Sequence, residues 1–91
     1  MLNRTKVSLI EDYLKSNFPG CRVEEKHEVG KSQYLRIRAG TESRHRVLVV
    51  HRFLQDHTPE EILTLLTEWR VAEQIRMAGT VLVLITNHGV R

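Results

Sequence analysis

Histidine and cysteine are among the side chains of this 91-residue chain that could ligate a metal or act as a base or nucleophile. The five histidines are His27, His45, His51, His57 and His88. None of them forms the HxxxH pairing on one helix that makes a zinc site recognisable. The single cysteine, Cys21, follows Pro19-Gly20 at the expected start of a strand, where a small apolar role is typical. We therefore expect no catalytic residue, no metal and no cofactor.

Three basic side chains near strand ends could instead bind an anion. Arg52, His57 and His88 are expected at one edge of the sheet, beside a helix that begins at Thr58. A helix N-terminus supplies unpaired amide donors and positive potential, and ligands often bind at the carboxyl ends of parallel strands. The edge could therefore hold a phosphate group or, as a weaker alternative, a metal ion. The remaining alternative is a solvated edge beside a capped helix.

Arginines form a further group, on two consecutive strand-like runs. They are Arg36, Arg38, Arg44 and Arg46. Strand alternation places all but Arg44 on one sheet face beside Tyr34. Basic residues with an aromatic side chain on a sheet can follow a nucleic-acid strand through phosphate contacts and stacking. Pairing of these arginines with Glu24 and Glu28 across the sheet is the alternative interpretation.

The apolar periodicity predicts the elements that must position these groups. Val7, Ile10 and Leu14 recur at helical spacing, and Pro19-Gly20 ends their helix. We expect a helix at about 4–17, strands at 21–29, 33–39, 44–54 and 81–85, and a second helix at about 59–78. A strand, a helix and a strand in succession form a right-handed crossover, so the last strand is expected to be parallel to the third. The prediction is one α+β domain over residues 1–91, ordered αβββαβ, with an antiparallel meander, a parallel C-terminal strand and two helices packed on the sheet.

The strand register follows from which residues must share the buried face. A three-residue loop at 30–32 would pair Val23 with Ala39. A longer second loop would bring Ile37 opposite Val47. Aliphatic residues on the outer face of the third run indicate that its middle is covered on both sides. The last strand, continuously apolar, is expected to be fully buried.

The helix at 59–78 has the clearest start signal and carries two apolar stripes. A capping box with a proline at the first helical position begins at Thr58. Beside the main stripe runs a second one, Val71, Ile75 and Ala78, and a helix that is apolar on two sides is contacted on two sides. This second stripe could pack beside the first helix or form a two-fold interface with another copy of the chain.

Composition and charge limit the classes of function. Hydrophobic residues make up 41% and charged residues 27% of the chain, and the formal charge is +3 from 14 basic and 11 acidic side chains. This is an ordinary globular composition, mildly basic and compatible with an anionic partner. The longest apolar run, 81–85, is too short to span a membrane, and the N-terminal segment lacks an apolar signal core. We expect a cytoplasmic protein without a membrane partner.

The predicted order αβββαβ resembles the common core of restriction-endonuclease-like nucleases. Those enzymes place an aspartate on the second strand and a Glu-x-Lys pair on the third, to hold magnesium and activate water. Here the runs at 34–38 (YLRIR) and 47–52 (VLVVHR) contain no carboxylate. The resemblance therefore implies a catalytically inactive relative. The first five elements are also similar in order to double-stranded-RNA-binding domains, although Glu60 and Glu61 stand where those domains carry a lysine cluster.

The expected function is that of a small binding domain that is not an enzyme. Its first expected role is a protein-interaction or regulatory module, a homodimer that self-associates through Val71, Ile75 and Ala78. The alternative is nucleic-acid binding by the arginine-bearing sheet face. An inactive nuclease-like core is the weaker alternative.

Overall fold

The fold is a mixed sheet with helices packed against it. The structure, a computed structural model, describes the backbone of residues 4–29 and 32–91 and the side chains of residues 4–25 and 32–91. The elements in chain order are α1 (Arg4–Asn17), β1 (Arg22–Val29), β2 (Ser32–Ala39), β3 (Glu42–Val49), α2 (His51–Asp56), α3 (Pro59–Glu68), α4 (Val71–Ala78), β4 (Leu82–Thr86) and β5 (Gly89–Val90). The sheet order is β1-β2-β3-β4-β5, and only the β3–β4 pair is parallel. The predicted α+β class, with a meander and a parallel crossover, is confirmed.

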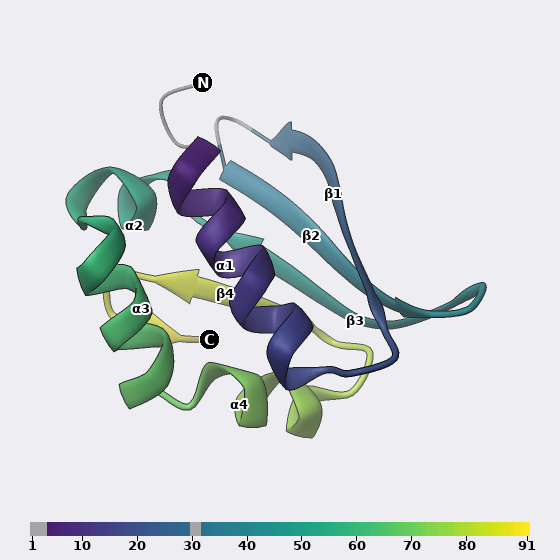
Figure 1. The fold of residues 1–91 in the computed structure, drawn as a ribbon. Helices are drawn as coiled ribbons and strands as arrows, with labels where there is room; N and C mark the ends of the chain where they lie inside the picture. The colour runs from purple at the N-terminus through teal and green to yellow at the C-terminus, as the bar shows by residue number, and fades with distance from the viewer. Residues whose placement is uncertain (1–3, 30–31) are drawn as a thin grey trace.

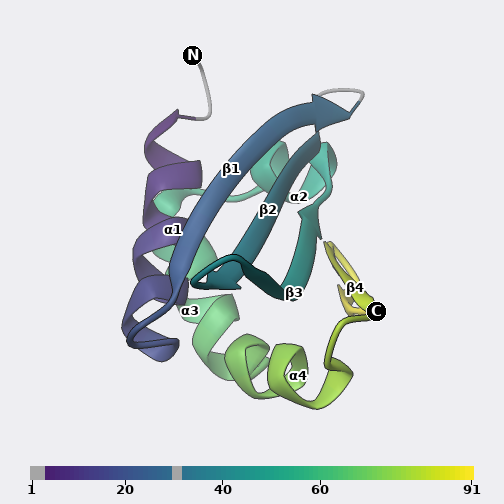
Figure 2. The ribbon, with the colours of Figure 1, turned by 90° about the vertical axis from the view of Figure 1, so that its right-hand side faces the viewer.

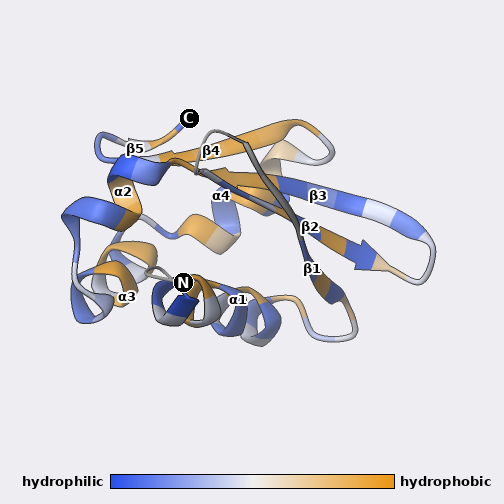
Figure 3. Cartoon of the chain, turned by 90° about the horizontal axis from the view of Figure 1, so that it is seen from above, coloured by the Kyte–Doolittle hydropathy of each residue, from blue (hydrophilic) through white to orange (hydrophobic). Residues whose placement is uncertain are grey.

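Helices α1, α3 and α4 cover one face of the sheet (Figure 1). The turned views show the sheet as one layer and these helices as a second, with α2 at the end of the sheet where β3 stops (Figures 2 and 3). No helix within residues 4–29 and 32–91 lies against the other face. We call the covered side the inner face and the bare side the outer face.

Strand alternation produces a core on the inner face alone. The inner positions of the three central strands are almost completely buried: Leu35, Ile37, Val47, Val49, Val83 and Ile85. Val7, Ile10 and Leu14 of α1 pack onto them, as the helical spacing predicts. The outer residue Leu48 is only half-buried, and burial alternates along β4. The predictions of a third strand covered on both sides and a fully buried last strand are therefore wrong.

The β1–β2 pairing has the predicted faces but a different register. Val23 pairs with Ile37, two residues away from the predicted partner Ala39. The register shifts after Glu25, because a bulge places an extra residue in one strand and displaces the pairs beyond it. The predicted loop at 30–32 falls largely outside the described residues.

A tight turn joins β2 to β3 in place of the longer loop that was predicted. Gly40, with a φ of 65°, reverses the chain so that β3 begins at Glu42. Glycine adopts this left-handed conformation without the steric cost of a Cβ atom. Ile37 consequently pairs with His45 and not with the predicted Val47. The inner and outer faces are unaffected, because the register differs by an even number of residues.

The third strand ends at Val49, not at the predicted Leu54, and the chain continues as α2. Phe53 and Leu54 are consecutive and both are fully buried. Neighbouring residues of a strand point to opposite faces, so a strand here would expose one of them on the outer face. A helical turn buries both, and the Nζ of Lys6 in α1 donates to the Leu54 carbonyl at 2.7 Å.

The predicted second helix is two helices, with a break between α3 and α4. Arg70 adopts a left-handed conformation with a φ of 51°, which ends α3 and lets α4 pack on β3 and β4. Such a break leaves backbone groups at both helix ends without partners. The Tyr13 hydroxyl of α1 satisfies two of them: it donates to the Leu66 carbonyl and accepts from the Ala72 N–H, both at 3.1 Å. One side chain thus joins three helices.

The helix break overturns the predicted self-association surface. Val71 and Ile75 are completely buried in the core, and Ala78 is half-buried against it. Because the chain turns at Arg70, these residues face the sheet and do not form a second exposed stripe. The prediction that they meet another copy of the chain is therefore wrong. Among the described residues, no helix is long and apolar enough to cross a lipid bilayer.

Candidate nucleic-acid interface

Arginines occupy the outer face of β1, β2 and β3 at one end of the sheet. The strand pairing aligns Arg36 with Glu24 on one side and with Arg46 on the other, and it aligns Arg38 with Arg22. At the outer positions of these strands, Glu24 is the only carboxylate whose side chain the structure describes. We refer to the four arginines as the basic rows. They place a concentrated positive charge on a face without helices.

Two of these arginines are held in place by hydrogen bonds. Arg38 donates from Nη1 to Glu24 Oε1 at 3.3 Å and from Nη2 to the Thr41 carbonyl at 2.8 Å. Arg46 donates from Nε and Nη2 to the Thr80 carbonyl at 3.1 and 2.9 Å, which ties β3 to the turn before β4. A guanidinium carries five N–H donors. Both side chains are therefore oriented and keep donors for an added anion.

Arg36, like Arg22, has no ion pair or hydrogen bond with any side chain that the structure describes. Glu24 is its direct cross-strand partner, yet that carboxylate bonds to Arg38. Arg36 is half-buried, and its Nε is covered without an acceptor. A charged donor whose hydrogen bonds are unfilled gains more from an added acceptor than one already paired. Arg36 therefore lies at the centre of the candidate interface.

An apolar row borders the basic rows on the same face. Tyr34, Leu48 and Leu84 are aligned on β2, β3 and β4, and each is half-buried. The Tyr34 hydroxyl has no hydrogen-bond partner in the described part of the chain. Adjacent rows are two residues apart along each strand, roughly 6–7 Å. The outer face thus places an aromatic ring and two leucines one step away from Arg36 and Arg46.

Arg44 stands apart from the basic rows. Arg44 has no cross-strand partner on β2, because the β2–β3 register shifts at this point. Its Nε lies 3.5 Å from Glu42 Oε1 near the hairpin turn. Both side chains are mostly exposed, so this ion pair contributes little to stability. Arg44 adds charge to the same end of the sheet without a fixed orientation toward the outer face.

The other predicted basic residues lie at the opposite end of the sheet, where β3 and β4 end. Arg52 is 3.7 Å from Asp56, the residue four positions later in the chain. The Asp56 carboxylate also accepts a hydrogen bond from Asn87 at 2.8 Å, which joins α2 to the turn that contains the exposed His88. The chain's own carboxylate thus neutralises the positive charge at this edge.

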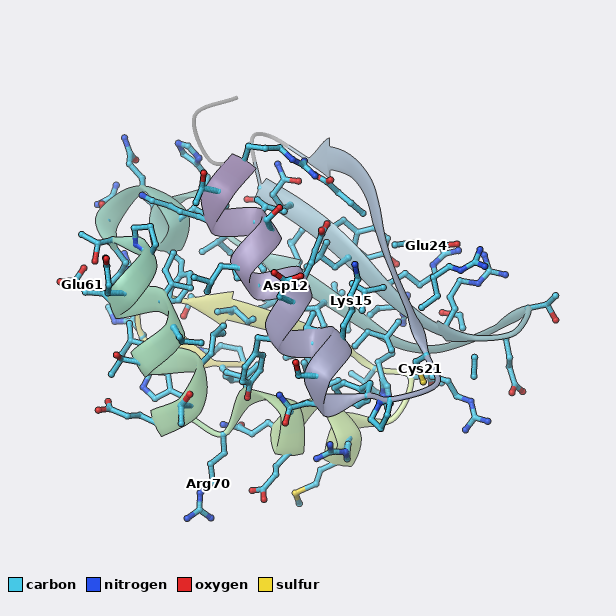
Figure 4. All side chains as sticks on the ribbon, in the orientation of Figure 1. Asp12, Lys15, Cys21, Glu24, Glu61 and Arg70 are labelled. Carbon is cyan, nitrogen blue, oxygen red and sulfur yellow. The ribbon has the colours of Figure 1, made fainter. Side chains whose placement is uncertain are left out.

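The start of α3 is also occupied by a carboxylate of the chain. Glu61 N donates to Thr58 Oγ1 at 3.2 Å and Thr58 N donates to Glu61 Oε1 at 2.9 Å, so the predicted capping box is confirmed. His57 packs its ring on Phe53, with Nδ1 2.9 Å from the Phe53 carbonyl. Glu61 lies at the opposite end of the molecule from Glu24 (Figure 4). Arg52 and His57 belong to α2 and its C-cap, and His88 lies in the turn that Asn87 joins to α2, so the predicted edge is present and anion binding there stays a prediction.

His45 and Cys21 contact the core or neighbouring rings, whereas the Nδ1 of His51 is buried without a hydrogen-bond partner among the described residues. The His45 ring lies 5.1 Å from the Phe18 ring, and its Nδ1 is 2.9 Å from the Gly79 carbonyl. Cys21 is half-buried and packs against the core. In residues 4–25 and 32–91, no group of three or more histidine, cysteine, aspartate or glutamate side chains is placed to hold a metal ion.

The contact between α1 and β1 places an ion pair on the inner face. Arg4 Nη1 donates to Glu25 Oε1 at 2.7 Å and to Oε2 at 3.0 Å. The hydrogen bond with Glu25 and the charge of that carboxylate raise the pKa of Arg4. Burial raises the pKa of Glu11 on α1, and repulsion by Glu25 raises it further. Glu25 is thus neutralised on the helix side and adds no negative charge to the outer face.

Sequence reasoning included Tyr34 but left Arg22, Leu48 and Leu84 out of the candidate site. Strand alternation alone places Arg22 on the same face as Glu24, so that signal was present. Leu48 and Leu84 gave no such signal, because an aliphatic residue on a strand normally indicates cover by another element. Only the arrangement of the helices shows that this face is bare.

The fold and the site together define a class: a two-layer α+β domain with an uncovered, arginine-bearing sheet face. Comparisons with protein-family models, with curated proteins and with solved structures find no match to this chain. The similarity in element order to restriction-endonuclease-like cores therefore stays a prediction.

Proposed function

We propose that this protein is a nucleic-acid-binding domain without catalytic activity, which holds its ligand on the outer face of the sheet. One observation carries the proposal. The basic rows place four arginines opposite a single described carboxylate, Glu24, on a face that no described helix covers. The planar guanidinium of arginine presents a fork of N–H donors that fits phosphate groups.

The hydrogen bonds of the basic rows support this proposal. Arg38 and Arg46 are oriented by backbone carbonyls before any ligand arrives. An oriented side chain loses less conformational freedom on binding than a free one. Arg22 and Arg36 lack a partner among the described side chains, so their exposed guanidinium donors can bind phosphate oxygens.

Salt dependence of binding is the direct test. Affinity for a mixed pool of fluorescent oligonucleotides is measured by anisotropy over a range of salt concentrations. Each phosphate contact releases counterions, so Arg36→Gln and Arg46→Gln should each weaken binding and lower the slope of log affinity against log salt by about one. Arg70→Gln is the matched control, because Arg70 projects from the helix side of the molecule (Figure 4).

The same experiment compares the two ends of the sheet. Arg52→Gln removes an equal charge at the far end and should leave both affinity and slope unchanged, since Arg52 already faces Asp56. Absence of salt-dependent binding to any oligonucleotide would refute the proposal. Equal losses in the Arg36, Arg52 and Arg70 variants would also refute it, because they would indicate net charge without a localised site.

Protein–protein association is a second candidate function, favoured by one observation. Met77 and Val81 flank the turn between α4 and β4, and they are 88% and 65% exposed. Large apolar side chains at such exposure are typical of contact surfaces when they lie together. Light scattering across a range of concentrations would report a dimer that Met77→Glu and Val81→Glu dissociate. A constant monomeric mass would exclude self-association.

A further inference from the structure

We infer that the outer face selects single-stranded over double-stranded nucleic acid, with bases against the apolar row and phosphates on the basic rows. This inference rests on the proposed function and adds the form of its ligand. It is carried by the juxtaposition of Tyr34, Leu48 and Leu84 with Arg36 and Arg46.

The geometry of the two sets of residues fits the two chemistries of a single strand. Cross-strand pairing sets Tyr34 next to Leu48, and Leu48 next to Leu84. Strands are about 4.8 Å apart, so this apolar row extends roughly 10 Å across the sheet. Arg36 and Arg46 form a line parallel to it, one step of roughly 6–7 Å away. A backbone that runs across the strands along the arginines would place its bases over the apolar row.

A duplex cannot use both rows at once. Its outer surface presents phosphates, and its base faces are stacked inside the helix. Duplex binding would satisfy the arginines but would press phosphates against Tyr34, Leu48 and Leu84, where they lose water without gaining a donor from the leucines. A single strand can splay its bases onto an aromatic or apolar surface, because those bases are not held by a partner strand.

Tyr34 is the residue that distinguishes the two ligands. It is the aromatic residue of the apolar row, it is half-buried, and its hydroxyl has no partner among the described residues. Every base has a π-face, so stacking on Tyr34 would be tolerant of sequence. We therefore expect preference for the single-stranded form, with little preference among bases.

The test compares one labelled oligonucleotide, of mixed sequence, as a single strand and as its blunt duplex. The protein should bind the single strand about tenfold more tightly than the duplex at the same salt concentration. Tyr34→Ala should weaken single-strand binding about tenfold, without changing the salt slope and without changing duplex binding. Tyr34→Phe, which keeps the ring, should retain the affinity. Leu63→Ala is the matched control, because Leu63 is an exposed apolar residue on helix α3.

Two sets of results would overturn the inference, and they are distinguishable. If single strand and duplex bind equally, and Tyr34→Ala changes neither while Arg36→Gln weakens both, the inference fails and the proposed function stands. If neither form binds with salt dependence, both fail together. Melting curves of the Tyr34 and Arg36 variants must match the parent protein, and Tyr34→Leu, which keeps an apolar side chain but removes the ring, provides the stacking test should Tyr34→Ala unfold.

Discussion

The two faces of the sheet are built from the same strands and behave as two different surfaces. Along β2, Leu35 and Ile37 are fully buried, whereas Tyr34 and Arg36, at intervening positions, are half-buried. The difference comes from the helix layer, which covers one face only. Charged residues on the inner face require a dedicated partner, as Glu25 has in Arg4. The outer face carries charge with donors still unfilled.

This contrast separates residues that stabilise the fold from residues available to a ligand. Inner positions of the sheet are packed against α1, α3 and α4, so their substitution acts on folding. Outer positions contact water and one another, so their substitution acts on binding with small effects on folding. Each experiment below measures whether that separation holds.

The largest effect is expected where the helix layer meets the sheet. Ile75→Asp places an unpaired carboxylate at a completely buried position. The free energy of unfolding should fall by roughly 4 kcal/mol or more, measured by urea unfolding followed by circular dichroism. Met77→Asp, on the same helix at an exposed position, is the control and should unfold like the parent. A folded Ile75→Asp protein that has only lost self-association would restore the original interface prediction.

A matched pair on adjacent strands measures the asymmetry of the two faces directly. Ile37→Ala on the inner face should cost about 2–5 kcal/mol of unfolding free energy, since it leaves a cavity in the core. Leu48→Ala on the outer face should cost about 1 kcal/mol, because that side chain is already half-solvated. Both losses of unfolding free energy are obtained from the denaturant midpoints, provided that the dependence of the unfolding free energy on denaturant concentration is unchanged. Equal losses would mean that the outer face is covered in solution.

The two tyrosines of the chain allow a comparison of hydroxyl groups. Tyr13→Phe leaves the Leu66 carbonyl and the Ala72 N–H without their shared partner at the helix break. We expect a loss of about 1–2 kcal/mol, because buried groups would lack a hydrogen bond. Tyr34→Phe removes a hydroxyl that has no partner among the described residues and should cost almost nothing. Thermal melting of both variants measures the two losses of stability. A similar loss for both would contradict the role of the Tyr13 hydroxyl as the shared hydrogen-bond partner.

The smallest effect is expected from charge at the α1–β1 contact. The pKa of Glu11 is raised by burial and by Glu25, so the native state binds this proton more tightly than the unfolded state. The contribution of Glu11 to stability is therefore most favourable below the ordinary pKa of a glutamate and declines as the pH rises through the raised pKa. Glu11→Gln should raise the melting temperature slightly at neutral pH and leave it unchanged near about pH 3.

The control for this pH dependence is Asp12→Asn, at the exposed neighbouring position. It should not reproduce the pattern. A stabilisation by Glu11→Gln that is equally large at low pH would exclude ionisation of Glu11 as its origin.

Local patterns predicted the elements well where a physical signal marked both ends. The first helix was predicted over 4–17 and is observed over Arg4–Asn17, because its apolar spacing and Pro19-Gly20 are unambiguous. The break at Arg70 had no such signal. Arginine is a good helix former, and apolar residues continue at helical spacing beyond it. The break exists because α4 must turn to bury Val71 and Ile75 on the sheet, which is a tertiary requirement.

The candidate site was also predictable only where local sequence patterns determine it. Alternation along a strand is local, so it placed Arg36, Arg38 and Arg46 on one face. Their pairing was not local: the register of β1 against β2, which shifts after Glu25, decides that Glu24 lies opposite Arg36, and Glu24 bonds to Arg38. The grouping of Arg52, His57 and His88 into an anion site stays a prediction, and the structure adds that Arg52 and His57 already have partners within the chain at that edge.

The bulge after Glu25 also affects whether β1 can pair with a strand of another chain. β1 is a terminal strand of the sheet, and such strands offer backbone donors and acceptors to any other extended chain. A β-aggregate grows by adding strands to an edge whose hydrogen-bonding groups are regularly spaced. A strand with a bulge has regular spacing only in short stretches. At the other end, β5 comprises just Gly89 and Val90. Both edges of the sheet are thus poor templates for an added strand.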